Sequence, residues 1–137
     1  MKHRDTIEYI LKELFTDPKT TAISDVFSSD YIAHTSKKNF TGLKVVSKWI
    51  KNLNQFLSDL RITKLEFIFE DQNTVVWKRT IKGKLKPSQN KKLPKGKSIQ
   101  WEEMIVSKFK GNLIVEEWIS SEFLGALLPL GNSKNLK

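Results

Sequence analysis

The sequence contains no cysteine among its 137 residues. That excludes a disulfide framework, a thiolate metal site and a cysteine nucleophile. Only two histidines are present, His3 and His34, and they lack the spacing of a paired metal-binding motif. The six glycines are scattered, so there is no glycine-rich loop of the kind that cradles phosphates. We therefore expect the protein to work without a metal and without a cofactor.

Long hydrophobic runs are also missing. No stretch approaches the ~20 apolar residues that a membrane-spanning helix needs. The N-terminal segment carries charges where a signal peptide carries an apolar run. Together with the lack of cysteine, this predicts a cytoplasmic protein with no membrane association. The length predicts one domain, residues 1–137.

The net charge of +9 comes from one basic stretch, which runs from Lys78 to Lys97. It holds nine of the 24 basic residues and no acidic residue, while the other 15 balance the 15 acids. Such a patch can attract nucleic acid. We favour a solvated hairpin loop, because the stretch has no aromatic residue on which bases could stack.

The first 60 residues carry helical periodicity. Residues 5–15 place apolar side chains at i, i+3, i+4, i+7 and i+8, which predicts an amphipathic helix. Residues 22–27 allow a short second helix, and residues 31–34 are interpreted as an irregular segment. Thr41-Gly42 opens a third helix, whose apolar stripe ends at Ser58-Asp59.

Beyond residue 60 the apolar period changes from 3.6 to 2, which is typical of strands. Alternation predicts strands at residues 64–69, 74–82, 99–109 and 113–121. Three helices followed by four antiparallel strands indicate the α+β class. Helices on one side of a curved sheet can enclose a pocket between the two layers.

Glu122 is the main candidate for acid–base chemistry. It is the only ionisable residue between Glu117 and Lys134. In a regular strand it shares a face with Ile114, Glu116, Trp118 and Ser120. A carboxylate in apolar surroundings has a raised pKa and exchanges protons near neutral pH. The alternative is a glutamate at a strand end that points to water.

Six further side chains are candidates. His34 is either a second acid–base group or a structural histidine. Trp77, Trp101 and Trp118 come from three strands and form either part of the core or the walls of a pocket for a flat apolar ligand. The strand acids Glu103 and Glu116 complete the inventory.

From Tyr31 to Gly131 the order of short segments resembles the SnoaL-like polyketide cyclases of the nuclear transport factor 2-like superfamily. The segments that carry the resemblance are Tyr31-Ile32-Ala33-His34 (Tyr-x-x-His), Thr41-Gly42, Ser58-Asp59-Leu60-Arg61 (Pro-Asp-Leu-Arg), residues 71–80 (Gly-Asp-x-Val), Pro94-Lys95-Gly96-Lys97 (Pro-Thr-Gly-Lys), and Glu117-Trp118 followed by Glu122, Leu124-Gly125 and Leu130-Gly131.

The resemblance implies a cone: three N-terminal helices packed on a strongly curved, four-to-six-stranded antiparallel sheet with an internal pocket. Tyr31 and the three tryptophans would line that pocket. The family's characterised cyclases perform an intramolecular aldol condensation without metal or cofactor, and Glu122 falls on their acid–base aspartate. Leu85 stands where the family often has a histidine. Pairing through the open sheet face is common in the superfamily, so the resemblance implies a homodimer.

Three functions follow as hypotheses. The first is a cofactor-free enzyme, a polyketide cyclase or an isomerase-like catalyst, in which Glu122 moves a proton alpha to a carbonyl and His34 orients the substrate or a water. The second is a non-catalytic module that binds an apolar small molecule. The third, least favoured, is nucleic-acid binding through the basic stretch.

Overall fold

A computed structural model describes residues 2–14, 20–86 and 96–121. The helices are α1 (His3–Tyr9), which continues as a wider π-helical turn over Ile10–Leu14, α2 (Thr20–Val26) and α3 (Leu43–Phe56). The strands are β1 (Phe27–His34), β2 (Asn39–Thr41), β3 (Leu57–Glu70), β4 (Thr74–Leu85), β5 (Ser98–Lys110) and β6 (Leu113–Ser121). The predicted α+β class and the three N-terminal helices are confirmed.

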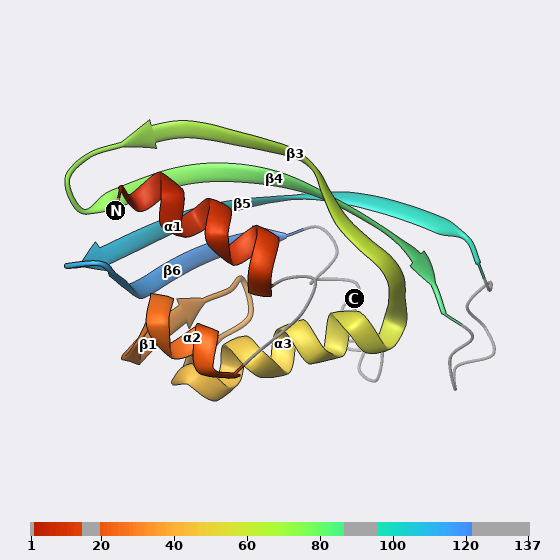
Figure 1. The fold of residues 1–137 in the computed structure, drawn as a ribbon, viewed down its shortest axis with the longest axis horizontal. Coiled ribbons are helices and arrows are strands. Elements are labelled where there is room, and N and C mark those ends of the chain that lie inside the picture. Colours follow the sequence, from red (N-terminus) through yellow and green to blue (C-terminus); the bar gives the residue numbers. More distant parts are fainter. Residues whose placement is uncertain (1, 15–19, 87–95, 122–137) are drawn as a thin grey trace.

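The strands form one curved, unclosed sheet in the order β2-β1-β6-β5-β4-β3. The pair β1–β6 is parallel and the other pairs are antiparallel. All three helices lie on one side of the sheet, and α3 leads directly into the long bent strand β3 (Figure 1). The arrangement leaves the other side of the sheet without a helical cover among the described residues.

Local sequence explains the turns and the third helix. Asp71 closes the β3–β4 turn, because its Oδ1 accepts hydrogen bonds from the backbone N–H groups of Asn73 and Thr74 at 2.9 and 2.8 Å. Gly111 supplies the positive φ of 62° in the β5–β6 turn. In α3, Val46, Ile50 and Leu53 form the predicted buried stripe.

Residues 31–34 belong to a strand and not to an irregular segment. Tyr31 and Ala33 are buried while the neighbouring side chains are less so, which is the alternation of a half-buried strand. The segment pairs with β2 on one edge and with β6 on the other. The expectation was wrong because this order comes from β6, a partner far along the chain.

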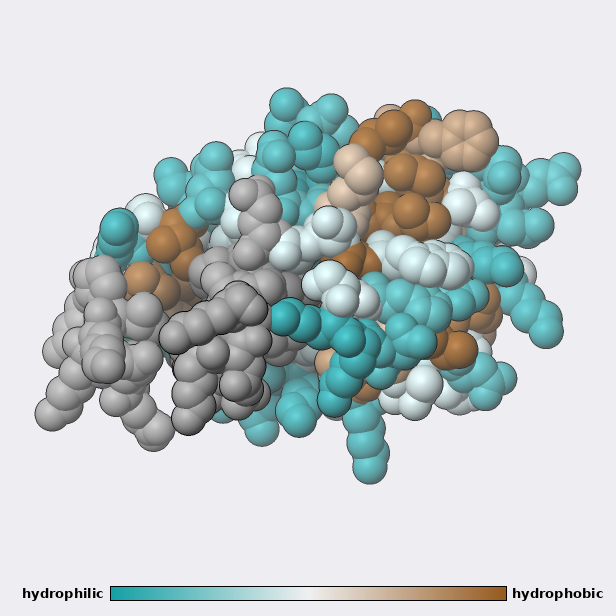
Figure 2. All heavy atoms as spheres, turned by 180° about the vertical axis from the view of Figure 1, so that it is seen from behind, coloured by the Kyte–Doolittle hydropathy of each residue, from teal (hydrophilic) through white to brown (hydrophobic). Residues whose placement is uncertain are grey.

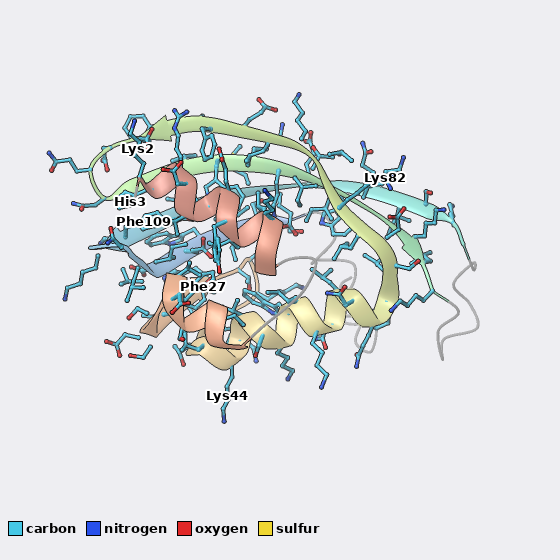
Figure 3. All side chains as sticks on the ribbon, in the orientation of Figure 1. Lys2, His3, Phe27, Lys44, Lys82 and Phe109 are labelled. Atoms are coloured by element: carbon cyan, nitrogen blue, oxygen red, sulfur yellow. The ribbon has the colours of Figure 1, made fainter. Side chains whose placement is uncertain are left out.

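The buried apolar side chains form two clusters. The larger lies where the helices meet the sheet and contains Tyr31, Trp77 and Ile105. The smaller lies where α3 turns into β3 and contains Trp101 and Leu85. At the opposite end of the fold, where Figure 3 labels both residues, His3 of α1 stacks on Phe109 of β5. Their ring centroids lie 3.9 Å apart. This contact holds the start of α1 on the sheet.

Candidate functional site

A cavity of about 70 Å³, partly open to solvent, lies between the helices and the concave face of the sheet. It has room for more than one water. Its apolar lining includes Phe27, Trp49, Ile50, Trp77, Ile105 and Ile119. Three polar side chains, Tyr31, Arg79 and Glu117, also border it. A mostly apolar cavity with a few convergent polar groups has the composition of a small-molecule site.

Strand register places these polar groups in rows across the concave face. Ser107 of β5 lies opposite Glu117 of β6, which in turn lies beside Ala33 of β1. Arg79 of β4 lies opposite Glu103 of β5, and Glu103 lies opposite Ser121. The row between these two contains only apolar side chains: Trp77, Ile105 and Ile119.

Glu117 is the central group of the site, with a residue exposure of only 6%. The Tyr31 hydroxyl donates to its Oε1 at 2.7 Å, and the Ser107 hydroxyl donates to its Oε2. Burial raises the pKa of the Glu117 carboxyl, and the hydrogen bonds from Ser107 and Tyr31 with the charge of Arg79 offset only part of the rise. The group is therefore suited to exchange protons closer to neutral pH than a solvated glutamate.

Two neighbours hold the carboxyl in place. Trp77 Nε1 donates to the Ser107 Oγ at 2.9 Å, which leaves the Ser107 hydrogen directed to Glu117. Burial and then the negative charge of Glu117 raise the pKa of Tyr31 well above its ordinary value. Tyr31 therefore stays a neutral hydroxyl, which can donate to the carboxylate or accept from the protonated acid.

Arg79 and Glu103 form a buried ion pair beside the cavity. Nε and Nη2 of Arg79 lie 2.7 and 2.6 Å from Oε1 of Glu103. The other oxygen, Oε2, accepts from Ser121 at 2.6 Å and from Trp101 Nε1 at 3.1 Å. Burial alone raises the pKa of Glu103, but Arg79 and these hydrogen bonds outweigh it and hold the pKa below its usual range.

The two glutamates thus have their pKa values displaced in opposite directions, Glu117 upward and Glu103 downward. Adjacent titratable groups separated in this way are the usual source of distinct acid and base roles in one site. Here Glu103 stays ionised as the partner of Arg79, and Glu117 is the group that can change its protonation state.

The site residues predicted from the sequence lie in several parts of the structure. Tyr31 and Trp77 line the cavity. Trp101 is buried in the smaller cluster and donates a hydrogen bond to Glu103. Trp118 is 42% exposed and lies outside the cavity lining. Glu122 lies outside the described residues.

His34 also lies outside the cavity lining. Its ring stacks on Trp118 with centroids 4.9 Å apart. Nε2 lies 2.5 Å from Oε2 of Glu116, and Nδ1 lies 2.8 Å from Oδ1 of Asn39. The bond to Glu116, then that to Asn39, raises the pKa of His34. The geometry therefore separates His34 from the carboxyl group that borders the cavity.

Sequence reasoning missed Glu117 because of one irregularity in β6. Phe109 pairs with Ile114 and Lys108 pairs with Glu116, so Val115 is an extra residue in β6. An extra residue inverts the faces of the strand that follows. Glu117 therefore points inward and Trp118 outward. The signal that could have been used is alternation along β6. Glu117 and Ile119 are two residues apart, so they share a face of the strand.

The basic stretch does not act as one surface in the described residues. Arg79 borders the cavity, Lys78 Nζ lies 3.3 Å from the Glu102 carboxylate, and Lys86 Nζ donates to the Asn54 carbonyl at 2.5 Å. Lys91, Lys92 and Lys95 lie outside the described residues. Nucleic-acid binding by this stretch stays a prediction.

Within residues 2–14, 20–86 and 96–121, no three His, Asp or Glu side chains gather as metal ligands would. In the same part of the chain no helix has the length and apolar character to cross a bilayer.

Solved structures with the same fold are numerous. A provisionally assigned polyketide cyclase from Acidithiobacillus ferrooxidans has 18% identity and a TM-score of 0.75, over 96% of this chain and 95% of its own. IdmH of Streptomyces antibioticus, also provisionally assigned as a polyketide cyclase, has 17% identity and a TM-score of 0.74, over 96% and 99%. A provisionally assigned SnoaL-like polyketide cyclase from Jannaschia sp. CCS1 has 12% identity and a TM-score of 0.74, over 95% and 92%.

Curated proteins gave no sequence match. The family model for the SnoaL-like polyketide cyclases, in contrast, matches residues 6–129, which is most of the chain. The sequence resemblance, the curved sheet under three helices and the structural neighbours agree with that match. The chain belongs to the SnoaL-like polyketide cyclase family.

Proposed function

We propose that this protein binds a small carbonyl compound in its cavity and catalyses cofactor-free proton transfer at the carbon alpha to the carbonyl. The observation that carries the proposal is the buried Glu117 carboxyl with its raised pKa at the edge of a largely apolar cavity. A general base with a pKa near the working pH accelerates such a transfer effectively. Enolate formation of this kind is also the first step of an aldol cyclisation.

The neighbouring groups support the proton transfer. Tyr31 and Ser107 each hydrogen-bond one oxygen of Glu117, so the carboxylate is held in a fixed orientation before substrate arrives. When Glu117 takes up a proton, the Tyr31 hydroxyl can turn from donor to acceptor. Trp49 and Trp77 offer apolar faces for a ring.

Glu122 remains a second proposed base. It follows Ser121, whose hydroxyl donates to Glu103 next to Arg79. Its family position and its place directly after the site strand both support a carboxyl at this end of the site. Comparison of Glu122→Gln with Glu117→Gln assigns the proton acceptor to one of the two.

Deuterium exchange tests the proposal directly. Cyclohexanone and 2-tetralone, a single-ring and a fused-ring ketone, are incubated with wild-type protein in D₂O, and loss of the alpha C–H signal is followed by NMR. We expect exchange faster than in buffer for at least one ketone. The variant Glu102→Gln, which alters an exposed carboxylate on the same sheet, should leave the rate unchanged. Exchange at the buffer rate with both ketones contradicts the proposal.

The alternative is a binding module without chemistry. It is favoured by one observation: both oxygens of Glu117 already accept hydrogen bonds from protein groups. Two donors stabilise the ionised form and oppose protonation. If either ketone quenches the tryptophan fluorescence but its alpha protons do not exchange, the protein is a binding module without chemistry. Exchange excludes it.

We also propose a homodimer formed through the open sheet face. Phe69, Val76, Val106 and Trp118 follow one another across four strands, and Phe69 and Trp118 are 57% and 42% exposed. Apolar side chains gather toward one end of the face turned away from the viewer of Figure 1 (Figure 2). A contiguous patch of exposed apolar side chains, unlike scattered ones, marks an association surface.

Sedimentation velocity checks the dimer. Val106→Glu places a charge in the middle of this row and should raise the dimer dissociation constant more than about tenfold, or 1.4 kcal/mol. Lys48→Glu, on the exposed side of α3, is the matched charge control and should have no effect. A wild-type protein that sediments as a monomer at every concentration refutes the dimer.

A further inference from the structure

The two oxygens of the Glu117 carboxyl have different neighbours. Oε1 accepts from the Tyr31 hydroxyl at 2.7 Å, and Oε2 accepts from the Ser107 hydroxyl. Tyr31 borders the cavity, whereas Ser107 is not part of its lining and is 0% exposed. The two hydroxyls therefore differ in where their hydrogens can turn when Glu117 takes up a proton.

Trp77 fixes the direction of the Ser107 hydrogen. The Trp77 Nε1 donates to the Ser107 Oγ at 2.9 Å, and an indole N–H cannot accept a hydrogen bond. A serine hydroxyl has a single hydrogen, so the one on Ser107 is left for Oε2 of Glu117. If Ser107 instead accepted a proton from Oε2, its own hydrogen would have to leave Glu117 inside a fully buried site. A buried O–H group without a partner is unfavourable.

Tyr31 has the freedom that Ser107 lacks. A phenol hydroxyl can donate to a carboxylate or accept from a carboxylic acid. Because Tyr31 borders the cavity, its hydrogen can turn into that space while its oxygen accepts from Oε1 of Glu117. Protonation at Oε1 therefore keeps both hydrogen bonds of the carboxyl group, whereas protonation at Oε2 loses the one from Ser107.

We propose that Trp77, acting through Ser107, is a positioning residue that reserves Oε1 of Glu117 as the atom that takes up the proton. This inference rests on the proposed proton transfer. In that step the alpha C–H bond breaks, the proton moves to Oε1, and the electron pair stays on the ligand as an enolate. Glu117 becomes neutral, Tyr31 turns from donor to acceptor, and Ser107 keeps its hydrogen on Oε2.

NMR titration of the Glu117 side chain tests the inference without a ligand. In ¹³C-labelled protein the carboxyl signal of Glu117 is identified by its absence from Glu117→Gln, and its chemical shift is followed against pH. Ser107→Ala removes a donor that serves only the ionised form, so the pKa of Glu117 should rise by about one to two units. Tyr31→Phe removes a partner of both forms and should raise that pKa by less.

A double-mutant cycle separates the hydrogen bond of Trp77 from its place in the cavity wall. Trp77→Phe frees Ser107 to accept from the protonated acid, so the pKa of Glu117 should rise by roughly half a unit. In the Ser107→Ala background the same change should have no effect. Trp49→Phe, at another tryptophan of the cavity lining, is the matched control for the lost ring volume and should not raise the pKa. Water that enters an enlarged cavity would lower it instead.

The inference is overturned if Tyr31→Phe raises the pKa of Glu117 at least as much as Ser107→Ala does. It is also overturned if Trp77→Phe leaves that pKa unchanged, lowers it, or acts equally with and without Ser107. Should Trp77→Phe fail to fold, the comparison of Ser107→Ala with Tyr31→Phe decides. The expected titration without ketone exchange rejects the proposed catalysis alone, and ketone exchange without the expected titration rejects only the assignment of Oε1.

Discussion

Glu117→Gln is expected to slow wild-type alpha-deuterium exchange by about a hundred- to ten-thousand-fold, which is the usual contribution of a general base. The amide has nearly the shape of the carboxyl but cannot accept the proton. Exchange measured by NMR with cyclohexanone and 2-tetralone gives the rate, and tryptophan quenching gives the affinity. We expect the affinity to change little, because the apolar lining is untouched.

The same variant should also be more stable than wild type above the pKa of Glu117. A carboxyl whose folded pKa is raised contributes stability that is fully present below its unfolded pKa and is lost as pH rises through the folded pKa. At higher pH, wild type therefore carries a buried charge that the amide lacks. We expect a gain of about 1 kcal/mol, the size of a single favourable substitution.

Urea denaturation over a pH series measures that gain. The stability difference between Glu117→Gln and wild type should grow as pH rises through the Glu117 transition and then level off. Glu102→Gln, at an exposed position, should show no such trend. A slower exchange rate with lower stability at every pH would mean that the amide disrupts the site, and the assignment of Glu117 as base would then fail.

The helices and the last strands were predictable because their signal is local. In α3, apolar side chains recur at helical spacing, and Val46, Ile50 and Leu53 are buried as that spacing requires. In β5, alternation placed Glu103 and Ser107 on one face with the apolar residues, and both are buried. Two polar members of the site were therefore on the correct face before their role was known.

Strand β1 was not predictable in the same way. It begins with Phe27 followed by three polar residues, so alternation is visible over only its second half. Its order depends on parallel pairing with β6, and parallel partners are joined by long connections. Local periodicity carries no information about such a partner. This is why the place of Tyr31 beside Glu117 could not be derived from the residues around it.

The inward position of Glu117 depends on one bulge in β6. Alternation without interruption puts Trp118 on the face of Ile114, whereas the extra residue Val115 puts Glu117 there. A one-residue change of register moves every later side chain to the opposite face. Sequence reasoning therefore reached the family and the strand, but it placed Glu116, and not Glu117, on the face of Ile114.

Arg79→Met alone is expected to destabilise the fold by about 3–5 kcal/mol, because it leaves the charge of Glu103 buried without its partner. Glu103 is 3% exposed and Arg79 is 15% exposed, so solvent screens neither well. Since small domains have a total stability of about 5–15 kcal/mol, this is a large fraction. Urea denaturation at neutral pH measures the loss.

The double variant Arg79→Met with Glu103→Gln should recover much of that loss, since removal of both members leaves no unpaired charge. The more exposed pair Lys78–Glu102 is the matched control, and its double-mutant cycle should give less than about 1 kcal/mol. The Arg79–Glu103 pair also predicts how the free energy of unfolding changes at low pH. A carboxyl with a lowered folded pKa contributes stability that is present above its unfolded pKa and lost as pH falls through the folded pKa.

Wild type should therefore lose stability in acid more steeply than the double variant. Additive single losses with no recovery in the double variant would show that Arg79 and Glu103 contribute separately, and Arg79 would then not be fixed by its partner.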